Sequence, residues 1–270
     1  MFDYHTHTNF SDDSTASPES MIERAIELKI KEYAITDHFD PDYPSEQYPF
    51  LLDFVNYHKM LIDIKKKYSE KIKIIKGIEM GIQPGKTMDK CNFEVDSFHY
   101  DFVIGSFHAC SGMEIDSPEF YESESPLKTY LIFYENMYEC LKSYKNYDVL
   151  GHFSIIDRYA PKIPDFKEYA ELVSEILKMI ISDGKGIELN TSSFRYNMMP
   201  TTLPRKEILE MYRDYGGRVL TMGSDAHKPE HISYGFKEMR NYLTSLGFDS
   251  ITTFENRKPS QNKQIGRAHV

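Results

Sequence analysis

Seven short strand-like segments alternate with helical segments along this chain, and this alternation limits its fold more than any other feature. The first segment begins near residue 2, and the others are EYAIT, KIKIIKGIE, YDFVIGSF, YDVLGH, KGIELN and RVLTMGS. They are rich in β-branched and aromatic residues, which is typical of buried strands. Strands that alternate with helices predict βα units around a parallel sheet, and a closed barrel fits 270 residues better than two separate sheets.

Local signals place two of the helices. Ser17 has the residue type of an N-cap and Pro18 that of a first helical residue, so we expect a helix over residues 17–29. Residues 165–184, DFKEYAELVSEILKMIISDG, carry one apolar stripe and end at Gly184, a typical stop. The stripe consists of Phe166, Tyr169, Val173, Ile176 and Ile180.

The end of the chain differs in pattern from the rest. Residues 256–270, NRKPSQNKQIGRAHV, are polar and without periodicity, and nothing before them has the composition of a linker. We therefore expect one domain over residues 1–255 and a tail over 256–270 that is disordered or foreign to the natural protein.

Composition indicates which class of ligand the protein binds and in which compartment it works. The net charge is -10, and Lys and Arg are scattered, which argues against a nucleic-acid groove and favours a small-molecule ligand. The three cysteines form no C-x-x-C pair, so neither a disulfide framework nor a thiolate zinc site is indicated. The chain opens on polar residues and has no long apolar stretch, so we expect a cytoplasmic protein without membrane contact, of unknown oligomeric state.

Potential metal ligands stand at the ends of six of the seven strand-like segments. In a barrel of βα units, the carboxyl ends of all strands meet at one face, where active sites are built. One histidine at one strand end is more often structural, but this repetition predicts a metal site with several ions. The residues are His5, His7, Asp37, His38, Glu79, His108, His152, Asp225 and His227.

The first segment, DYHTHTNFSDD, adds ligands from a strand and from the loop behind it. His5 and His7 are two positions apart, so on a strand they face the same side. A single His-x-His pattern fits a polar strand end equally well, and the other strand ends favour the metal site. Asp12, with Asp13 as the alternative, can complete a second or third metal site. The competing interpretation is that both carboxylates only face solvent in a loop that leads into a helix.

The ligand types restrict the metal without selecting one. Imidazoles and carboxylates without thiolates suit zinc, iron or manganese, and a carboxylate can bridge two ions. Glu79 is the best candidate for this bridge, because it lies on a central strand between glycines. Asp37 precedes His38 and is a candidate for orienting an imidazole rather than for binding metal.

Taken together, these motifs resemble the polymerase and histidinol phosphatase (PHP) superfamily. DYHTHTNFSDD, TDHF, GIE, GSFH, GH and GSDAH occur in the order of that family and span nearly the whole chain before the tail. DVLGHFSIIDRY, GIELNTSSFR and GSDAH followed by YGF resemble its histidinol-phosphate phosphatase branch, which works in histidine biosynthesis. The chain departs from related phosphatases in the first loop, where a histidine often stands one position beyond Asp12.

The resemblance implies a distorted TIM-like (β/α)7 barrel with a metal site at the C-terminal ends of its strands. It implies two or three divalent ions, Zn, Fe or Mn, and hydrolysis of L-histidinol phosphate to L-histidinol and phosphate. The implied ligands are His5, His7, Asp12, His38, Glu79, His108, His152, Asp225 and His227.

Phosphoryl transfer also needs fixed cations around the equatorial oxygens, and arginine forks match phosphate geometry. Arg158 and Arg195 lie in loops after strands, and the resemblance favours both as phosphate ligands over surface ion pairs. Tyr159 is a candidate for packing on the substrate imidazole, although core packing explains it almost as well. The acid that protonates the leaving alkoxide is His227 or a water molecule bound to metal.

Three other interpretations compete with this one. The first is a PHP enzyme that acts on nucleotides or nucleic-acid ends, and the negative net charge and the absence of a basic stripe argue against it. A non-catalytic module with a degenerate site is opposed by the complete ligand set. An amidohydrolase that cleaves a C–N bond would usually have a bridging lysine at a strand end, and none of the strand-like segments ends in one.

Overall fold

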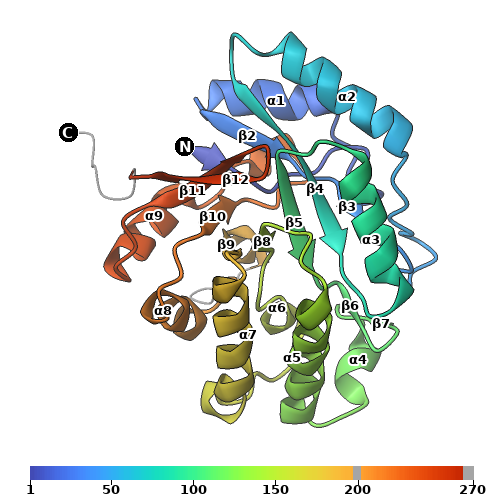
Figure 1. The fold of residues 1–270 in the computed structure, drawn as a ribbon, viewed down its shortest axis with the longest axis vertical. Helices are drawn as coiled ribbons and strands as arrows, with labels where there is room; N and C mark the ends of the chain where they lie inside the picture. The colour runs from blue at the N-terminus through green and yellow to red at the C-terminus, as the bar shows by residue number, and fades with distance from the viewer. Residues whose placement is uncertain (197–201, 264–270) are drawn as a thin grey trace.

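Seven parallel strands form a barrel in the computed structural model, which describes residues 1–196 and 202–263 (Figure 1). The order around the barrel follows the order in the chain, as successive βα units require. The strands are β1 (Phe2–Asp3), β2 (Glu32–Ile35), β4 (Lys73–Gly81), β5 (Phe102–Ser106), β8 (Val149–Leu150), β9 (Gly186–Asn190) and β10 (Leu220–Gly223). The predicted α/β barrel class is confirmed.

The first and last barrel strands close the ring through backbone hydrogen bonds. The N–H of Tyr4 donates to the carbonyl of Met222 at 3.0 Å, and the N–H of Asp225 donates to the carbonyl of His5 at 2.8 Å. A short strand β3 (His38–Phe39) pairs with β4 beyond the end of β2. The closure therefore brings the first and last histidine motifs of the sequence beside each other.

Amphipathic helices follow the strands and bury their apolar sides on the barrel. The predicted start of α1 is confirmed, since the Ser17 hydroxyl accepts from the N–H of Ser20 at 3.2 Å. The stretch from residue 165 begins instead with a separate turn η1 (Phe166–Glu168), and α7 starts at Ala170. The other helices are α1 (Pro18–Glu27), α2 (Phe54–Lys67), α3 (Lys86–Ser97), α4 (Pro118–Glu122), α5 (Pro126–Ser143), α6 (Ile156–Tyr159), α8 (Lys206–Asp214) and α9 (Phe236–Ser245), with turns η2 (Ser192–Tyr196) and η3 (Pro229–His231).

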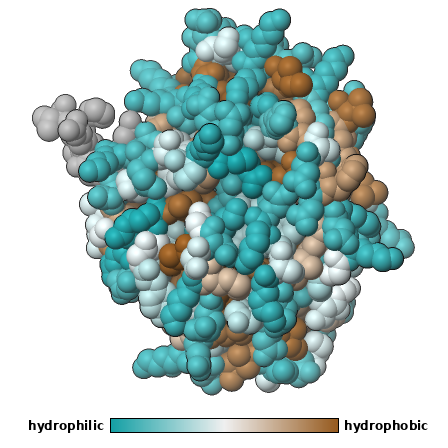
Figure 2. Space-filling view, viewed as in Figure 1, coloured by the Kyte–Doolittle hydropathy of each residue, from teal (hydrophilic) through white to brown (hydrophobic). Residues whose placement is uncertain are grey.

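The outward sides of these helices are polar. Figure 2 shows a largely hydrophilic face, on which apolar side chains form small separate groups. Among the described residues, none of the helices combines the length and hydropathy that a membrane crossing requires.

Two hairpins cover opposite ends of the barrel. The short hairpin of β6 (Ala109–Cys110) and β7 (Met113–Glu114) follows β5 at the carboxyl end. The second, β11 (Ile251–Glu255) with β12 (Lys258–Asn262), lies at the amino end, where the N–H of Leu220 donates to the Thr252 hydroxyl at 3.0 Å. Ordered structure thus continues past residue 255, and five residues of the tail predicted to be disordered form a strand because they pair with β11. Residues 264–270 of that tail lie outside the described residues.

Candidate metal centre

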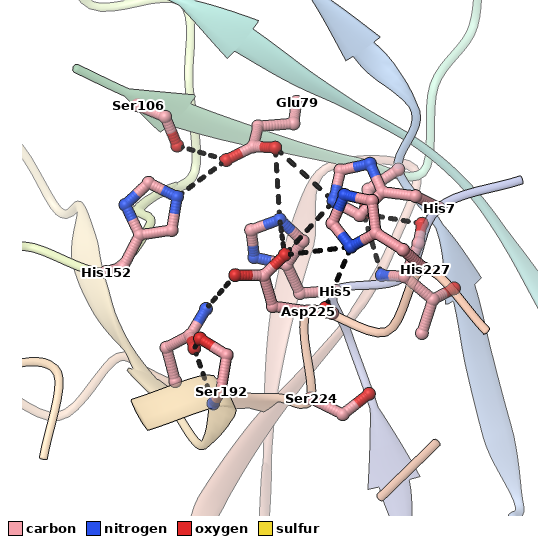
Figure 3. Close-up of polar contacts among 12 residues, drawn as sticks. His5, His7, Glu79, Ser106, His152, Ser192, Ser224, Asp225 and His227 are labelled. Carbon is pink, nitrogen blue, oxygen red and sulfur yellow. Dashed lines mark hydrogen bonds and ion pairs between the residues drawn. The ribbon is translucent and has the colours of Figure 1, made fainter. Parts of the chain in front are cut away.

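Glu79, near the end of β4, lies among histidines contributed by four other strand ends, and Figure 3 shows it with His5 and His152. Its Oε1 is 3.0 Å from Nε2 of His152 and 3.3 Å from Nε2 of His108. Its Oε2 is 3.1 Å from Nε2 of His5 and 3.1 Å from Nδ1 of His38. The two oxygens of one fully buried carboxylate therefore face different pairs of imidazoles.

Asp225, which follows β10, directs a carboxylate oxygen at the two histidines of the first strand. Its Oδ1 lies 3.4 Å from Nε2 of His7 and 3.9 Å from Nε2 of His5. The His7 ring is stacked between those of His227 and His38, with ring centroids 4.1 and 4.3 Å away. Five strand ends that are far apart in the sequence, those of β1, β2, β5, β8 and β10, thus form one continuous cluster with Glu79.

The cluster has the donor atoms of a metal site. In the described part of the chain, buried Nε2 of His5, Nε2 of His7 and Oε2 of Glu79 have no hydrogen-bond partner, although they face one another closely. Buried polar groups are rarely left in this way, and convergent lone pairs are what a cation binds. Four sets of three donor atoms are close enough to hold an ion: His7, His38 and His227; His5, His7 and Asp225; His5, Glu79 and His152; and His38, Glu79 and His108.

Two further carboxylates fix the orientation of the imidazoles. Glu188 on β9 accepts from Nδ1 of His5 at 2.8 Å, and Asp40 accepts from Nδ1 of His108 at 2.6 Å. A proton held at Nδ1 leaves the Nε2 lone pair of each ring directed at Glu79. The pairs therefore select the tautomer that a metal ion requires.

Asp37 acts on the cluster through a serine. Its Oδ1 accepts from the Ser11 hydroxyl at 2.8 Å, and the Ser11 oxygen lies 3.2 Å from Nδ1 of His7. The N–H of His38 also donates to the Ser11 oxygen, at 3.0 Å. In the orienting role predicted for Asp37, the contact to the imidazole of His7 therefore runs through the Ser11 hydroxyl, which contacts both side chains.

Protons and metal ions compete for these nitrogen atoms. Burial alone would lower the pKa of His5, but Glu188, Glu79 and Asp225 raise it well above its usual range. Burial and the neighbouring imidazoles lower the pKa of His7 to about 3. Although burial opposes it, the facing histidines hold the pKa of Glu79 well below its usual range. The Glu79 carboxylate is therefore ionised and requires cations, either protons on the imidazoles or metal ions.

The backbone at two strand ends is strained. His152 and Asp225 have positive φ values of 23° and 52°, which residues with a Cβ adopt at a cost of about 1–3 kcal/mol. The N–H of His152 donates to Oε2 of Glu188 at 2.8 Å, which helps to hold this conformation. Such strain is commonly stored at functional sites.

Two glycines make room for the orienting carboxylates. A Cβ at Gly223 would overlap Oε1 of Glu188, and a Cβ at Gly81 would overlap the Asp40 carboxylate. Gly81, two residues after Glu79, therefore makes room for the Asp40 carboxylate.

Asp13, and not Asp12, faces the cluster. Asp13 Oδ2 lies 2.9 Å from Nε2 of His227 and 3.8 Å from Nε2 of His38. Asp12 instead accepts from the N–H of Phe50 at 2.7 Å and so ties its loop to the segment before α2. The structure thus favours the alternative, Asp13, over the first choice, Asp12, because only one of two adjacent side chains can turn inward.

Arg158 is joined to the cluster by a line of polar side chains along β9. Its Nη2 donates to the Ser192 hydroxyl and lies 3.7 Å from Oδ2 of Asp225. Ser192 donates to Oδ1 of Asn190, whose Nδ2 donates to Oε2 of Glu188 at 3.1 Å. Figure 3 shows Ser192 and Asp225 at one side of the cluster.

Arg195 holds the strand end that carries Asp225. Its two terminal nitrogens donate to the carbonyls of Ser224 and Asp225, each at 2.6 Å. Arg158, Arg195 and Tyr159 line a cavity of about 150 Å³ beside the cluster, and the Arg158 guanidinium lies 5.7 Å from the centre of the Tyr159 ring. All three predicted substrate-binding residues therefore reach the face where the predicted metal ligands meet.

Sequence reasoning missed Glu188 and Asp40. Glu188 stood in a strand, KGIELN, to which no function was assigned, and Asp40 followed the TDHF motif. A signal was present for β9, because Glu188, Asn190 and Ser192 are spaced by two and face one side if the chain stays extended. A glutamate in an otherwise apolar strand needs a partner inside the barrel.

Comparisons with known proteins agree with this geometry. The family model of the PHP domain matches residues 3–192, well over half of the chain. A histidinol-phosphatase from Lactococcus lactis is 30% identical over 269 residues, 97% of each chain. A probable histidinol-phosphatase from Clostridium acetobutylicum is 32% identical over 241 residues, 88% of this chain and 90% of the relative.

Solved structures give the same result. The crystal structure of histidinol phosphate phosphatase from Lactococcus lactis, complexed with zinc, L-histidinol and phosphate, superposes with a TM-score of 0.85 at 27% identity, covering 96% of this chain and 98% of that one. A putative histidinol phosphatase from Listeria monocytogenes has a TM-score of 0.77 at 23% identity and supports the fold alone. This chain belongs to the PHP family, in its histidinol-phosphatase branch.

Proposed function

We propose that this protein is a metal-dependent phosphatase that hydrolyses L-histidinol phosphate to L-histidinol and phosphate. The observation that carries the proposal is the position of Arg158 and Arg195 in one cavity with the histidine and carboxylate cluster. The names of the relatives, which cover nearly the whole chain, support the substrate. The reaction is a step of amino-acid biosynthesis.

We infer that two or three divalent ions bind, with zinc, iron or manganese compatible with the donors. Glu79 suits the bridging role because its two oxygens face different histidines. The fit of Asp13 beside His227 and His38 makes it the preferred carboxylate of the outermost set. The ligand set is then His5, His7, Asp13, His38, Glu79, His108, His152 and Asp225, with His227 either as a further ligand or as the proton donor.

When bound, such ions lower the pKa of water toward neutrality and neutralise phosphoryl charge. The protein residues supply the remaining interactions. Arg158 and Arg195 have five N–H donors each, so both can bind phosphate oxygens while keeping their present partners. Their positive charge stabilises the charge that develops on the equatorial oxygens in the transition state.

His227 has two possible roles that exclude each other. Its Nδ1 lies 3.1 Å from the carbonyl of Asp225, and its Nε2 faces Asp13, so Nε2 either binds an ion or carries a proton for the leaving alkoxide. A His227→Asn variant that keeps its metal content but loses the alkaline limb of its pH–rate profile would identify the proton donor. Loss of one ion per chain would identify the ligand instead.

The experiment that tests the function is phosphate release from a panel of monoesters by protein reconstituted with zinc, manganese or iron. We expect L-histidinol phosphate to have a much larger kcat/KM than AMP or p-nitrophenyl phosphate, because its remote groups orient the phosphate. Chelation should abolish the rate, and metal addition should restore it. Equal rates on AMP would contradict the assignment, and activity that survives with less than one ion per chain would contradict the metal mechanism.

A further inference from the structure

The outer surfaces of α2 and α3 carry exposed apolar side chains that the proposed reaction does not use. Phe93 on α3 is 76% exposed, Val55 on α2 is 80% exposed, and Leu51, which precedes α2, is 67% exposed. We call these three residues the α2–α3 patch. Figure 2 shows brown side chains over α2 and α3, at the upper right of this face. Apolar groups that gather in one place on a polar surface usually mark a site of association.

A groove between the two helices adjoins this patch. The residues that line the groove are Phe39, Phe54, Asp89, Lys90, Phe93 and Glu94. The rings of Phe39 and Phe54 pack edge to face, with centroids 4.7 Å apart, and this contact fixes the apolar side of the groove. The Phe93 ring makes no ring contact among the described residues. The surface thus has an apolar groove and, at its edge, an aromatic side chain that is left mostly in water.

Charges of both signs lie beside the apolar groups. Asp89 lines the groove on α3, and Lys59 is exposed on α2, one helical turn after Val55. Within the described part of the chain, neither Asp89 nor Lys59 takes part in an ion pair, whereas Lys90 is paired with Asp42 at 2.6 Å. The two helices therefore present one carboxylate and one ammonium group that are both available to a partner.

We propose that two copies of this chain associate through the α2–α3 patch, related by a two-fold axis. In such an interface the same surface serves both copies, so it must contain both members of every contact. This surface does so, because Phe93 of each copy can enter the groove of the other, and Lys59 of each copy can pair with Asp89 of the other. The proposal does not depend on which reaction the protein catalyses.

A second copy fits this surface better than an unrelated partner does. A partner that only filled the groove would leave the protruding Phe93 ring in water beside it, whereas a second copy supplies a groove for that ring. Aromatic side chains that fill a pocket of the partner carry much of the binding free energy at protein interfaces. The Lys59 and Asp89 charges then set the orientation of the two copies.

The first test is analytical ultracentrifugation of the full chain over a series of protein concentrations. The proteins are wild type, Phe93→Asp and the matched control Ile163→Asp, which changes an exposed apolar residue outside the patch. We expect wild type and Ile163→Asp to form dimers with the same dissociation constant. Phe93→Asp should raise this constant by roughly 100-fold or more, because each dimer loses two aromatic anchors. Its far-UV spectrum should be unchanged, since the Phe93 side chain is mostly exposed.

The second test reverses the two charges. Asp89→Lys and Lys59→Glu should each raise the dissociation constant by roughly 5- to 30-fold, because like charges then face each other across the interface. The double variant restores opposite charges in the reversed order. We therefore expect its dissociation constant to return to within about threefold of that of the wild type.

Three results would overturn the proposal. A wild type that stays a single chain at every concentration would leave the groove to a different kind of partner. A dimer that Phe93→Asp does not weaken would place the interface on another surface. If the two single charge reversals weakened the dimer but the double variant did not recover, Lys59 and Asp89 would not meet across a two-fold axis.

Discussion

The two ends of the barrel bury the same kinds of residue but treat their charges differently. At the amino end, Asp101 accepts from Lys65 at 2.6 Å, and Asp148 accepts from Arg257 at 2.5 Å. At the carboxyl end, Glu79 is also buried, but it faces imidazoles, which are neutral unless protonated. One end neutralises its carboxylates with its own side chains, and the other depends on added cations.

This difference separates a structural carboxylate from a functional one. A buried ion pair with its own lysine or arginine is complete, and removing one partner destabilises the fold. A buried carboxylate among neutral donors is incomplete, and its free energy depends on what binds there. The four variants below test this distinction, in order of decreasing effect on catalysis.

Glu79→Gln should have the largest effect on activity. The neutral amide keeps the shape of the side chain but loses the charge that faces His5 and His152. We expect kcat/KM to fall by about three orders of magnitude or more, since several kcal/mol of transition-state stabilisation depends on the ions. Elemental analysis should show fewer ions per chain, with the far-UV spectrum unchanged. Full metal content at wild-type rate would place Glu79 with the structural carboxylates.

Arg195→Ala should have the next largest effect. Loss of a charge-assisted contact to phosphate is worth about 1.5–3 kcal/mol, or roughly 10- to 150-fold in kcat/KM. Because Arg195 also holds the carbonyls of Ser224 and Asp225, we expect the alanine variant to lose metal more readily. Excess metal should then restore occupancy but not the rate. Arg195→Lys should recover part of the rate, since it keeps the charge without the fork. Complete rescue by metal would mean that Arg195 supports only the metal site.

Glu188→Gln should weaken metal binding rather than chemistry. Its carboxylate orients His5, and loss of such a partner typically costs about 10- to 100-fold in metal affinity or activity. Titration against a chelator of known affinity should reveal the loss. At saturating metal, kcat should be near that of the wild type. An unchanged metal affinity would show that His5 is held by its backbone alone.

Arg257→Ala should have the smallest effect on catalysis, although it lies in an ion pair. Asp148 is 6% exposed and loses its cationic partner, so we expect about 1–3 kcal/mol less stability in urea unfolding. The rate should stay within about twofold of wild type, as should that of the exposed control Lys258→Ala. A large loss of rate in Arg257→Ala alone would show that the two ends are coupled.

The barrel and most candidate ligands could be predicted from sequence because both depend on short-range patterns. His5 and His7 alternate along one strand, and Glu79, His152 and Asp225 each end a strand. Once βα alternation is recognised, topology brings strand ends to one face without any detail of packing.

The remaining features depend on contacts between distant segments. Whether Asp12 or Asp13 turns inward is decided by the N–H of Phe50, which lies in another loop. Asp40 and Glu188 function through residues on other strands, His108 and His5. No local motif marks Asp40, and only the two-residue spacing along β9 marks Glu188. The pairing of residues 258–262 with β11 could not be predicted either, because this polar segment contains a proline and shows no alternation.

The overlap between a Cβ at position 223 and Glu188 has a consequence for how such proteins diverge. A Cβ at position 223 would overlap not only Glu188 but also Cβ of His5, an atom that every residue except glycine has. Shortening the side chain at position 188 therefore cannot by itself permit a larger residue at 223. Gly81 is restricted in the same way, because a Cβ there would overlap not only the Asp40 carboxylate but also Cβ of Asp40, at 2.8 Å. In descendants of this sequence, positions 81 and 223 should therefore both stay glycine as long as residues 40 and 5 carry a side chain.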